Sequence, residues 1–330
     1  MRNRIVMLGA VAALAVAPVP ARAQCSGAAQ AMDACQKTMD LVTFLTPQLA
    51  TGLAGGNHTL GQGGALGGLG HFAIDVRASV VNGAFPKLGG VGFNTSSAVT
   101  STFNADKQMI PGLVADAAVG LWNGYSLGVT HVGAIDALVS ASYLPNISGG
   151  DVSLQTSGGN LQFGYGLRVG LLEESVITPG VAFSYLSRSL PQFTLTGNVT
   201  AAGSNAAGSI ALSNYAIKVN GWRLTAAKDL LLLNVNAGIG QDTYKADASV
   251  AATVNAPAPI GTKQATGSTS LSMSRTNMFV GLSLNLFVAK LVAEAGQVTG
   301  GSLPSMTNHF GSDDPAKSRG YFSAGLRFGF

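Results

Sequence analysis

Charged side chains are scarce in this sequence. Lysine, arginine, aspartate and glutamate make up 10% of the 330 residues, less than half of the roughly 25% typical of a soluble domain. The hydrophobic share is ordinary at 47%. Such a chain either buries its apolar residues in a large core or turns every second one toward lipid. The net charge of +4 is diffuse, and no basic cluster with interleaved aromatic residues occurs, so we expect no nucleic-acid partner.

Cysteine is almost absent, which limits the redox and metal chemistry that the chain can carry. Cys25 and Cys35 are the only two cysteines. A redox or metal pair needs closer spacing or additional ligands, and none are near. We therefore predict that Cys25 and Cys35 form a disulfide that closes a small local loop.

A segment long and apolar enough to form a membrane-spanning helix is missing beyond the first residues. Two arginines precede an apolar run over residues 5–19, and an Ala-Arg-Ala motif follows at residues 21–23. This order predicts a signal peptide over residues 1–23 and a mature chain that begins at Gln24. The run is too short and too early to remain as a spanning helix. Gln24 is not the small residue that must precede a lipid-modified cysteine, so we expect no lipid anchor.

The beginning of the mature chain, residues 24–69, lacks strand-like alternation. An Ala-rich stretch up to about Leu53 has the helical spacing of apolar residues, and we expect Pro47 to end or bend this helix. A glycine-rich tract then continues to Gly70. Because no strand precedes this tract and no lysine follows it, a phosphate-binding loop is a poor interpretation. Glycine instead permits a backbone to pass close to a neighbouring wall.

Beyond Gly70 the dominant pattern is the alternation of apolar and polar residues, which predicts β-strands with one apolar face. The cleanest example is LQFGYGLRVGL at residues 161–171. We expect ten such strands, and the loops near Val99 and over residues 194–200 leave room for two more. The predicted strands cover residues 71–80, 113–121, 131–143, 161–171, 176–187, 209–226, 231–243, 275–286, 289–299 and 320–330.

The last predicted strand, GYFSAGLRFGF over residues 320–330, ends the chain on an aromatic residue of its apolar face. About 9–11 tilted residues cross the hydrocarbon core of a bilayer, so this strand is long enough to span one. It resembles the C-terminal signature of bacterial outer-membrane β-barrels. The resemblance implies a location in the outer membrane, lipid as the surrounding partner, and recognition of the strand ending at Phe330 by the barrel-assembly machinery.

The connections between the predicted strands alternate between short and long. Tight links near Asn123, Glu173, Lys228 and Ala289 alternate with long segments rich in glycine, serine, threonine and asparagine. Outer-membrane barrels have short periplasmic turns and long extracellular loops. We therefore predict an all-β fold, a transmembrane antiparallel up-and-down β-barrel of about 10–12 strands over residues 70–330, with both termini in the periplasm. Residues 24–69 then form a short helical and Gly-rich segment that lies on the periplasmic side or plugs the lumen.

Charged residues within the strands should face the lumen, because Arg or Lys on the lipid face costs about 2–4 kcal/mol at mid-membrane. The expected acids gather on one arc of the barrel and the bases on the others. Two interpretations stay open, a salt-bridge network that fills a narrow barrel and a transverse field across a water-filled pore. The expected lumen charges are Asp75, Arg77, Asp116, Asp136, Arg168, Lys218, Arg275 and Arg327.

The positions of the histidines argue against an enzyme. Outer-membrane enzymes place their catalytic pairs on strands or at the extracellular rim, whereas His71 and His131 fall near the periplasmic ends of their strands. His309 lies in a loop beside Asp313 and Asp314, which lack the regular ligand spacing of a calcium site. We expect no catalytic residue, no cofactor and no metal site.

Two functions are compatible with such a barrel. The first is a passive channel or transporter of small or hydrophobic compounds, similar to the fatty-acid transporter family in having an N-terminal plug, although the Asn-Pro-Ala sequence of that family is not found near Gln24. The second is a closed structural or surface-binding barrel with functional extracellular loops. The interior distinguishes them, because paired charges indicate a closed barrel and an apolar tunnel indicates transport.

Overall fold

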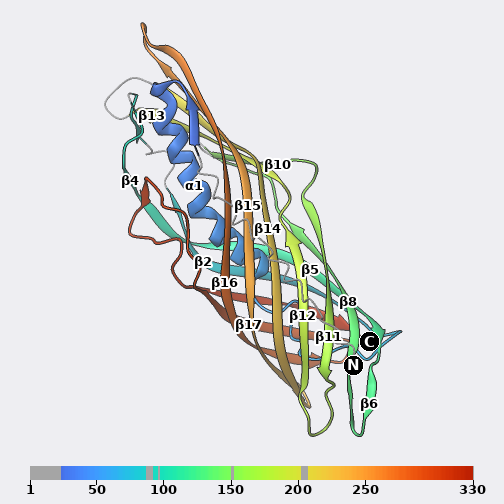
Figure 1. Cartoon of the computed structure of the whole chain (residues 1–330). Coiled ribbons are helices and arrows are strands. Elements are labelled where there is room, and N and C mark those ends of the chain that lie inside the picture. Colours follow the sequence, from blue (N-terminus) through green and yellow to red (C-terminus); the bar gives the residue numbers. More distant parts are fainter. Residues whose placement is uncertain (1–23, 87–91, 96, 150–151, 202–206, 330) are drawn as a thin grey trace, which may run out of the picture.

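Ten strands of the described chain pair with their sequence neighbours in antiparallel order, and the last pairs with the first, so the sheet closes into a barrel (Figure 1). The computed structural model describes residues 24–86, 92–95, 97–149, 152–201 and 207–329. The predicted signal peptide over residues 1–23 and the final Phe330 lie outside these described residues. The barrel strands are β2 (Phe72–Pro86), β5 (Ala105–Trp122), β8 (Ala134–Tyr143), β11 (Leu161–Leu172), β12 (Gly180–Ser189), β14 (Ala207–Leu230), β15 (Leu233–Ala256), β16 (Gly261–Leu286), β17 (Ala289–Thr299) and β19 (Arg319–Gly329).

The closure confirms the up-and-down barrel and gives ten strands. β19 pairs with β2 from Tyr321 opposite Val81 to Gly329 opposite Ala73. Residues 194–200 do hold a strand, β13 (Phe193–Ala201), but it pairs with β14 and with β10 (Val152–Thr156) and does not enter the ring. The twelve-stranded alternative is therefore wrong for the described chain.

Short strands occur at both ends of the barrel and lie outside the ring. β1 (Gln24–Gly27) adds to the edge of β16, and β9 (Ile147–Gly149) adds to β10. The parallel pairs are β3 (Gly92–Phe93) with β13, and β4 (Thr102–Phe103) with β18 (His309–Phe310). A small hairpin of β6 (Tyr125–Leu127) and β7 (Thr130–Val132) joins β5 to β8.

Three neighbouring strands are much longer than a bilayer requires. β14 and β15 have 24 residues each and β16 has 26, against about 9–11 for one crossing. The long loop expected between the seventh and eighth strands is instead strand that continues to a turn at residues 257–260. We call the far parts of these three strands the extension (residues 207–220, 243–256 and 261–274) and their end of the barrel the extension end. The opposite end, where residues 231–232 and 287–288 make the tight turns, is the short-turn end.

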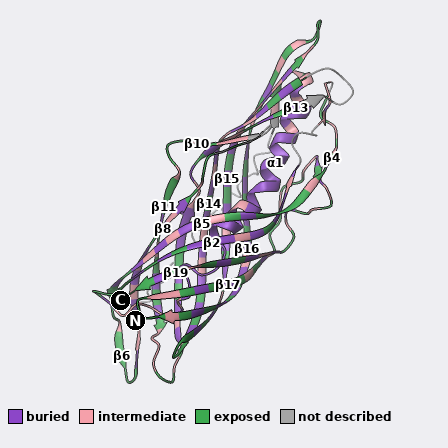
Figure 2. Cartoon of the chain, turned by 180° about the vertical axis from the view of Figure 1, so that it is seen from behind, coloured by how far each residue is buried: buried purple, intermediate pink, exposed green. Residues whose placement is uncertain are grey.

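The polarity of the outer face reverses within each of these long strands. On β16 the outward side chains near the short-turn end are apolar and those of the extension are serines, although the inward–outward alternation continues unbroken. Figure 2 shows that alternation as stripes of buried and exposed residues. The exposed apolar residues are Met278, Val280, Leu282, Leu284 and Leu286, and the exposed serines are Ser268, Ser270, Ser272 and Ser274.

The reversal falls at one level on adjacent strands. Met278 on β16 is opposite Ile239 on β15, the last apolar outward residue there, and Gln241 follows on the same face. Gln241 is in turn opposite Trp222 on β14. Trp and Tyr collect at membrane–water interfaces. The level of Trp222, Ile239 and Met278 therefore marks the edge of the membrane-spanning belt.

The one helix of the described residues, α1 (Ala29–Ala54), fills the interior of the extension (Figure 1). Most of its residues are buried, which is the pattern of a helix enclosed on all sides. Inward side chains of the extension pack against it, and Tyr215 shares a hydrogen bond of 2.7 Å with Thr46. The helix continues through Pro47 to Ala54 rather than ending there, because packing on every face outweighs the missing N–H hydrogen bond.

The two described ends of the chain lie at opposite ends of the barrel. Gln24 pairs with Ser268 in the extension, whereas Gly329 pairs with Ala73 at the short-turn end. Gln24 and Gly329 therefore do not share one side of the membrane, as the expectation that both termini are periplasmic requires. After α1 the Gly-rich segment runs through the lumen and joins β2, so most of residues 31–68 lie inside the barrel, whereas part of β1 at one end of the segment and Leu69 at the other are exposed.

Cysteine labelling tests where the belt ends. In protein refolded into lipid nanodiscs, Ser272→Cys should react with a membrane-impermeant maleimide, and Leu282→Cys should react only after lipid is removed, because lipid covers its side chain. Cys25 and Cys35 are joined in a disulfide, so the unmodified chain serves as the unlabelled control. Equal labelling rates of the two variants in nanodiscs would contradict the assigned boundary.

Candidate functional site

A layer of buried charged side chains crosses the barrel at the level of the membrane belt and surrounds residues 54–66. Each of the ten barrel strands contributes at least one inward polar side chain to hydrogen bonds in this layer. Arginines and carboxylates dominate. The charged members are Asp75 and Arg77 on β2, Asp116 on β5, Asp136 on β8, Arg168 on β11, Arg188 on β12, Arg223 on β14, Asp242 on β15, Glu294 on β17 and Arg327 on β19.

Arg223 is the most extensively bonded member of the layer. Its guanidinium forms a two-point contact with Asp242, at 2.8 and 2.9 Å. The same group donates to the carbonyl oxygens of Ala54 and Gly56, at 3.0 and 2.8 Å. These are carbonyls at and just after the end of α1, which have no partner within the helix. Arg223 therefore ties the end of the helix to the barrel wall.

A second cluster is centred on Asp116. Arg188 Nη2 lies 2.8 Å from Asp116 Oδ1, and Arg77 Nη2 lies 2.9 Å from Asp116 Oδ2. Both arginines also donate to the lumenal segment, Arg77 to the carbonyl of Asn57 at 2.6 Å and Arg188 to that of His58 at 3.2 Å. Two cations around one carboxylate leave positive charge that these carbonyl dipoles partly satisfy.

Carboxylates of the layer accept hydrogen bonds from backbone amides of the same segment. Asp136 accepts from the amide of Leu66 at 3.1 Å while paired with Arg168 at 2.8 Å. Asp75 accepts from the amide of Leu60 at 3.1 Å, and Glu294 accepts from that of Asn57 at 3.0 Å. An irregular backbone at membrane depth must find such partners. The layer supplies them.

Two glycines of the segment are required by the close approach of the wall. A Cβ added at Gly56, whose φ is +84°, would lie 1.6 Å from Glu294 Oε1. A Cβ at Gly63 would lie 2.2 Å from the backbone nitrogen of Ala227, and Thr225 donates to the Gly63 carbonyl at 2.9 Å. The glycine-rich composition thus allows the segment to lie directly against β14 and β17.

Seven of the eight expected lumen charges lie inside the barrel, and one does not. Lys218 is exposed on the outer face of β14, so its assignment to the lumen is wrong. Lys218 belongs to the extension, where the interior is apolar and the exterior polar. Arg275 faces inward from β16 opposite Asp242, but it donates to the carbonyls of Ala316 and Lys317 in the loop before β19 and not to the plug or to a carboxylate of the layer. The remaining six, in the layer itself, are Asp75, Arg77, Asp116, Asp136, Arg168 and Arg327.

Sequence reasoning missed four charged members of the layer, Arg188, Arg223, Asp242 and Glu294. With them, the acids Asp116 and Asp136 and the bases Arg168, Arg188 and Arg223 still occupy separate arcs of the ring, as expected. Ion pairs join the two signs, three of them between neighbouring strands and one between Arg188 on β12 and Asp116 on β5. The charges of the layer are therefore largely paired with one another. Asp242 had a visible signal, since it continues the polar face of Asn234 and Asn236.

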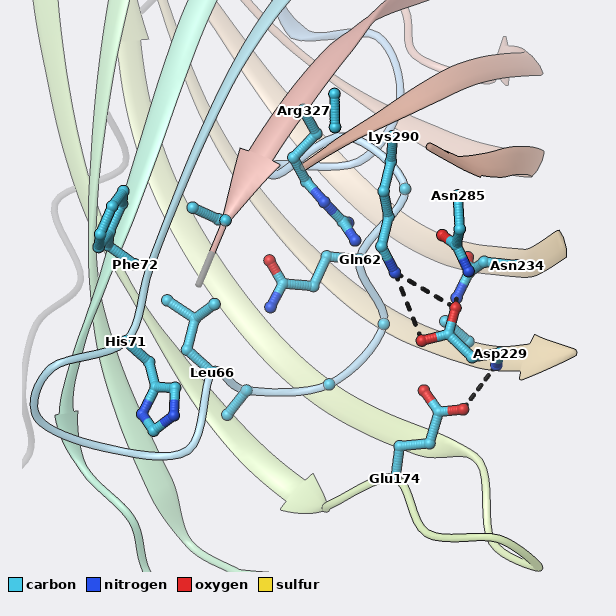
Figure 3. A pocket seen from close by; sticks show the side chains of 18 of the residues that line it. Gln62, Leu66, His71, Phe72, Glu174, Asp229, Asn234, Asn285, Lys290 and Arg327 are labelled. Atoms are coloured by element: carbon cyan, nitrogen blue, oxygen red, sulfur yellow. Dashed lines mark hydrogen bonds and ion pairs between the residues drawn. The ribbon is translucent and has the colours of Figure 1, made fainter. Parts of the chain in front are cut away.

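A cavity of about 320 Å³ lies at the short-turn end, and Figure 3 shows its charged lining. Lys290 Nζ lies 3.3 Å from Asp229 Oδ1, and the backbone amide of Asp229 donates to Glu174. Arg327 points into the cavity from β19 while it donates to the carbonyl of Leu60 at 2.9 Å. The Gly-rich segment forms part of the wall of this cavity.

The cysteines and histidines occupy structural positions. Cys25 and Cys35 form a disulfide with a Cα–Cα distance of 6.1 Å, which links β1 to the first turns of α1. His58 Nδ1 lies 2.9 Å from Ser184 Oγ inside the layer, and His131 forms an ion pair with Glu173. Among the residues that the structure describes, no three His, Cys, Asp or Glu side chains form a group able to hold a metal ion.

The closed ring, the apolar outer belt and the polar interior define a transmembrane antiparallel β-barrel of the outer-membrane class. Within the described residues, no helix combines the length and apolarity needed to cross a membrane. No family model matches the sequence, and no curated protein matches it.

Solved structures of similar fold are outer-membrane proteins. The outer membrane protease OmpT from Escherichia coli is 11% identical over 79% of this chain and 97% of that chain, with a TM-score of 0.38. The translocator domain of the autotransporter NalP from Neisseria meningitidis is 16% identical over 92% of this chain and 99% of that chain, with a TM-score of 0.33. Ail, the attachment invasion locus protein of Yersinia pestis, is 10% identical over 79% of this chain and 99% of that chain, with a TM-score of 0.26. Likeness at this level carries no argument about function.

Replacing Arg223 should destabilise the protein strongly. Arg223→Met leaves Asp242 buried without its cation, a change that typically costs about 3–5 kcal/mol, and it removes the donors to Ala54 and Gly56. The free energy of unfolding is measured by urea titration of refolded protein in lipid vesicles, with tryptophan fluorescence as the signal.

Lys218→Met on the same strand is the matched control, and its effect should stay within about 0.5 kcal/mol because the side chain is exposed. The double variant Arg223→Met with Asp242→Leu should recover part of the loss, since the uncompensated carboxylate is gone. Equal effects of Arg223→Met and Lys218→Met would contradict the role of Arg223.

Proposed function

We propose that this protein is a closed outer-membrane barrel whose N-terminal segment is a built-in plug and whose extension is a surface-binding platform outside the cell. The observation that carries the proposal is the charged layer. Its arginines and carboxylates pair with each other and with the backbone of residues 54–66, so interacting charged side chains and plug backbone occupy the lumen at membrane depth.

The alternative function, a passive channel or transporter of small or hydrophobic compounds, has less support. A narrow barrel is largely filled by side chains even without a plug, and here a chain segment is added. An apolar tunnel would favour transport, whereas the layer at membrane depth is built from paired charges. The cavity at the short-turn end is consistent with a vestibule and not with a channel through the barrel, because residues of the plug form part of its wall.

The plug also positions the loops of the extension end. Asp33 on α1 accepts hydrogen bonds from the amides of Asn94 at 2.7 Å and Val99 at 2.9 Å. Asp40 accepts from the amide and the side chain of Asn308, at 2.8 and 2.7 Å. Burial raises the pKa of Asp40, and these hydrogen bonds oppose the rise. Loops fixed on a rigid scaffold are suited to recognition, which supports the binding platform.

The orientation follows from the lengths of the connections. Short turns are periplasmic in outer-membrane barrels, so the proposal puts the short-turn end in the periplasm and the extension outside. Export by the signal peptide over residues 1–23 and insertion through the strand that ends at Phe330 belong to the same proposal. No catalytic activity is included, because His58 and Ser184 are sealed within the layer.

Single-channel recording tests the closed state. The refolded mature protein in a planar bilayer should give no steady conductance, because ions would have to cross a layer already filled by paired charges and plug backbone. A chain that lacks residues 24–69 is the comparison, with its folding checked by heat-dependent gel mobility. Conductance of this chain alone would identify the segment as the plug, and silence of both chains would mean that the side chains of the narrow barrel close it without the segment. Steady conductance of the full chain would overturn the proposal whatever the truncated chain does.

A further inference from the structure

A second cavity, of about 480 Å³, lies on the barrel wall where β2, β5 and β19 emerge from the membrane belt. Its lining includes Asn82 from β2, Lys107 and Met109 from β5, and Lys317 and Arg319 from the start of β19 and the loop before it. Asn82 is opposite Met109 in the register of β2 and β5, and both are exposed. This cavity lies at the other end of the belt from the cavity at the short-turn end, and the two share no lining residue.

The described residues that line this cavity carry three cations and no carboxylate, namely Lys107, Lys317 and Arg319. Arg319 is buried, and its Nε has no hydrogen-bond partner. Behind it, Arg275 also has an unpartnered Nε and Nη1. Asp313 pairs with Lys317 and with Arg319 from the loop side, and Asp314 lies near Arg319 and Arg275. These two acids balance only part of the charge of Lys107, Lys317, Arg319 and Arg275.

This excess of positive charge also affects the ionisation of Lys317. Burial lowers the pKa of Lys317, and the nearby positive charges of Arg319 and Lys107 lower it further. Three cations held near one another repel, and an anion placed among them would remove that repulsion. The arrangement is therefore poised for a ligand with at least one full negative charge.

The height of the cavity on the barrel indicates where that anion comes from. Met109, two-thirds exposed, forms its lower margin on the outer face. Directly below on the same face follow the apolar residues Pro111 and Val80, which are opposite each other, and Phe322 on β19. The cavity thus lies at the edge of the apolar belt, which is the depth of lipid headgroups.

We propose that this basic cavity binds the phosphate of an anionic lipid headgroup in the leaflet at the extension end, with the lipid's acyl chains lying along the apolar belt below Met109. The three cations contact the phosphate, and Asn82 and Ser318 supply further polar groups at its margin. The site does not depend on whether the barrel is open or closed, so it stands apart from the proposed plug function.

Native mass spectrometry of the refolded mature protein in detergent micelles tests the site. The probes are phosphatidic acid, which carries a phosphate monoester, and phosphatidylcholine with the same acyl chains. The unmodified protein should bind phosphatidic acid at least about tenfold more tightly. The double variant Lys107→Gln with Lys317→Gln should lose this preference, and Asp313 keeps Arg319 as its partner in that variant.

The matched control is Lys218→Gln with Lys245→Gln, two exposed lysines that face each other on β14 and β15 away from the cavity. This control should keep the full preference, and gel mobility confirms that both double variants are folded. Retention of the preference by the cavity variant, or its equal loss in the control, would overturn the proposal. Displacement of the lipid by inorganic phosphate at concentrations where phosphatidic acid competes would assign the site to free phosphate instead of a lipid.

Discussion

The structure depends on one constraint, the need of the plug backbone for hydrogen-bond partners at membrane depth. Residues 55–66 have no regular secondary structure of their own, yet they run through a lumen that the sheet separates from lipid. Arg223, Arg77 and Arg188 supply donors to their carbonyls, and Asp75, Asp136 and Glu294 accept from their amides. The same plug groups in turn offset part of the cost of burying those charges. The charged layer and the plug therefore stabilise each other.

A second feature is that the same inward–outward alternation of side chains continues along each long strand from the lipid-covered belt into the water-exposed extension. Along β15 the outward residues change from Leu233 and Val235 in the belt to Lys245 and Asp247 in the extension, while the inward residues change from Asn236 and Asp242 to Tyr244 and Val250. The strand does not twist to exchange its faces. In the belt, lipid surrounds a barrel whose interior is polar. In the extension, water surrounds strands whose inward side chains are apolar and pack against α1. The extension therefore has the polarity of a water-soluble domain, with a sheet packed against a helix, and its strands continue into the membrane barrel.

Much of the barrel could be predicted from sequence because its strands alternate cleanly in the belt, as residues 161–171 do. The extension could not, because its alternation has the same period but the opposite orientation: Lys218, predicted in the lumen, is exposed, and its apolar neighbours Ile217 and Val219 are buried. The run of outward serines from Ser268 to Ser274, in register with Met278, carried the signal of this reversal. The layer was predicted in part, through Asp75, Asp116, Asp136 and Arg168. The hydrogen bonds between the layer and the plug could not be predicted, since backbone carbonyls such as that of Gly56 have no signature in sequence.

The way in which the plug is held also bears on whether it can leave. At the extension end, β1 pairs with β16 over four residues, and the disulfide between Cys25 and Cys35 joins β1 to α1. At the short-turn end the segment continues covalently into β2, which is a strand of the ring. A plug fixed at both ends cannot be released into either compartment as a unit. Any opening of the lumen would have to occur by rearrangement inside the barrel, against the hydrogen bonds of Arg223 and Arg77, and this is the physical reason to regard the segment as a permanent core of the barrel.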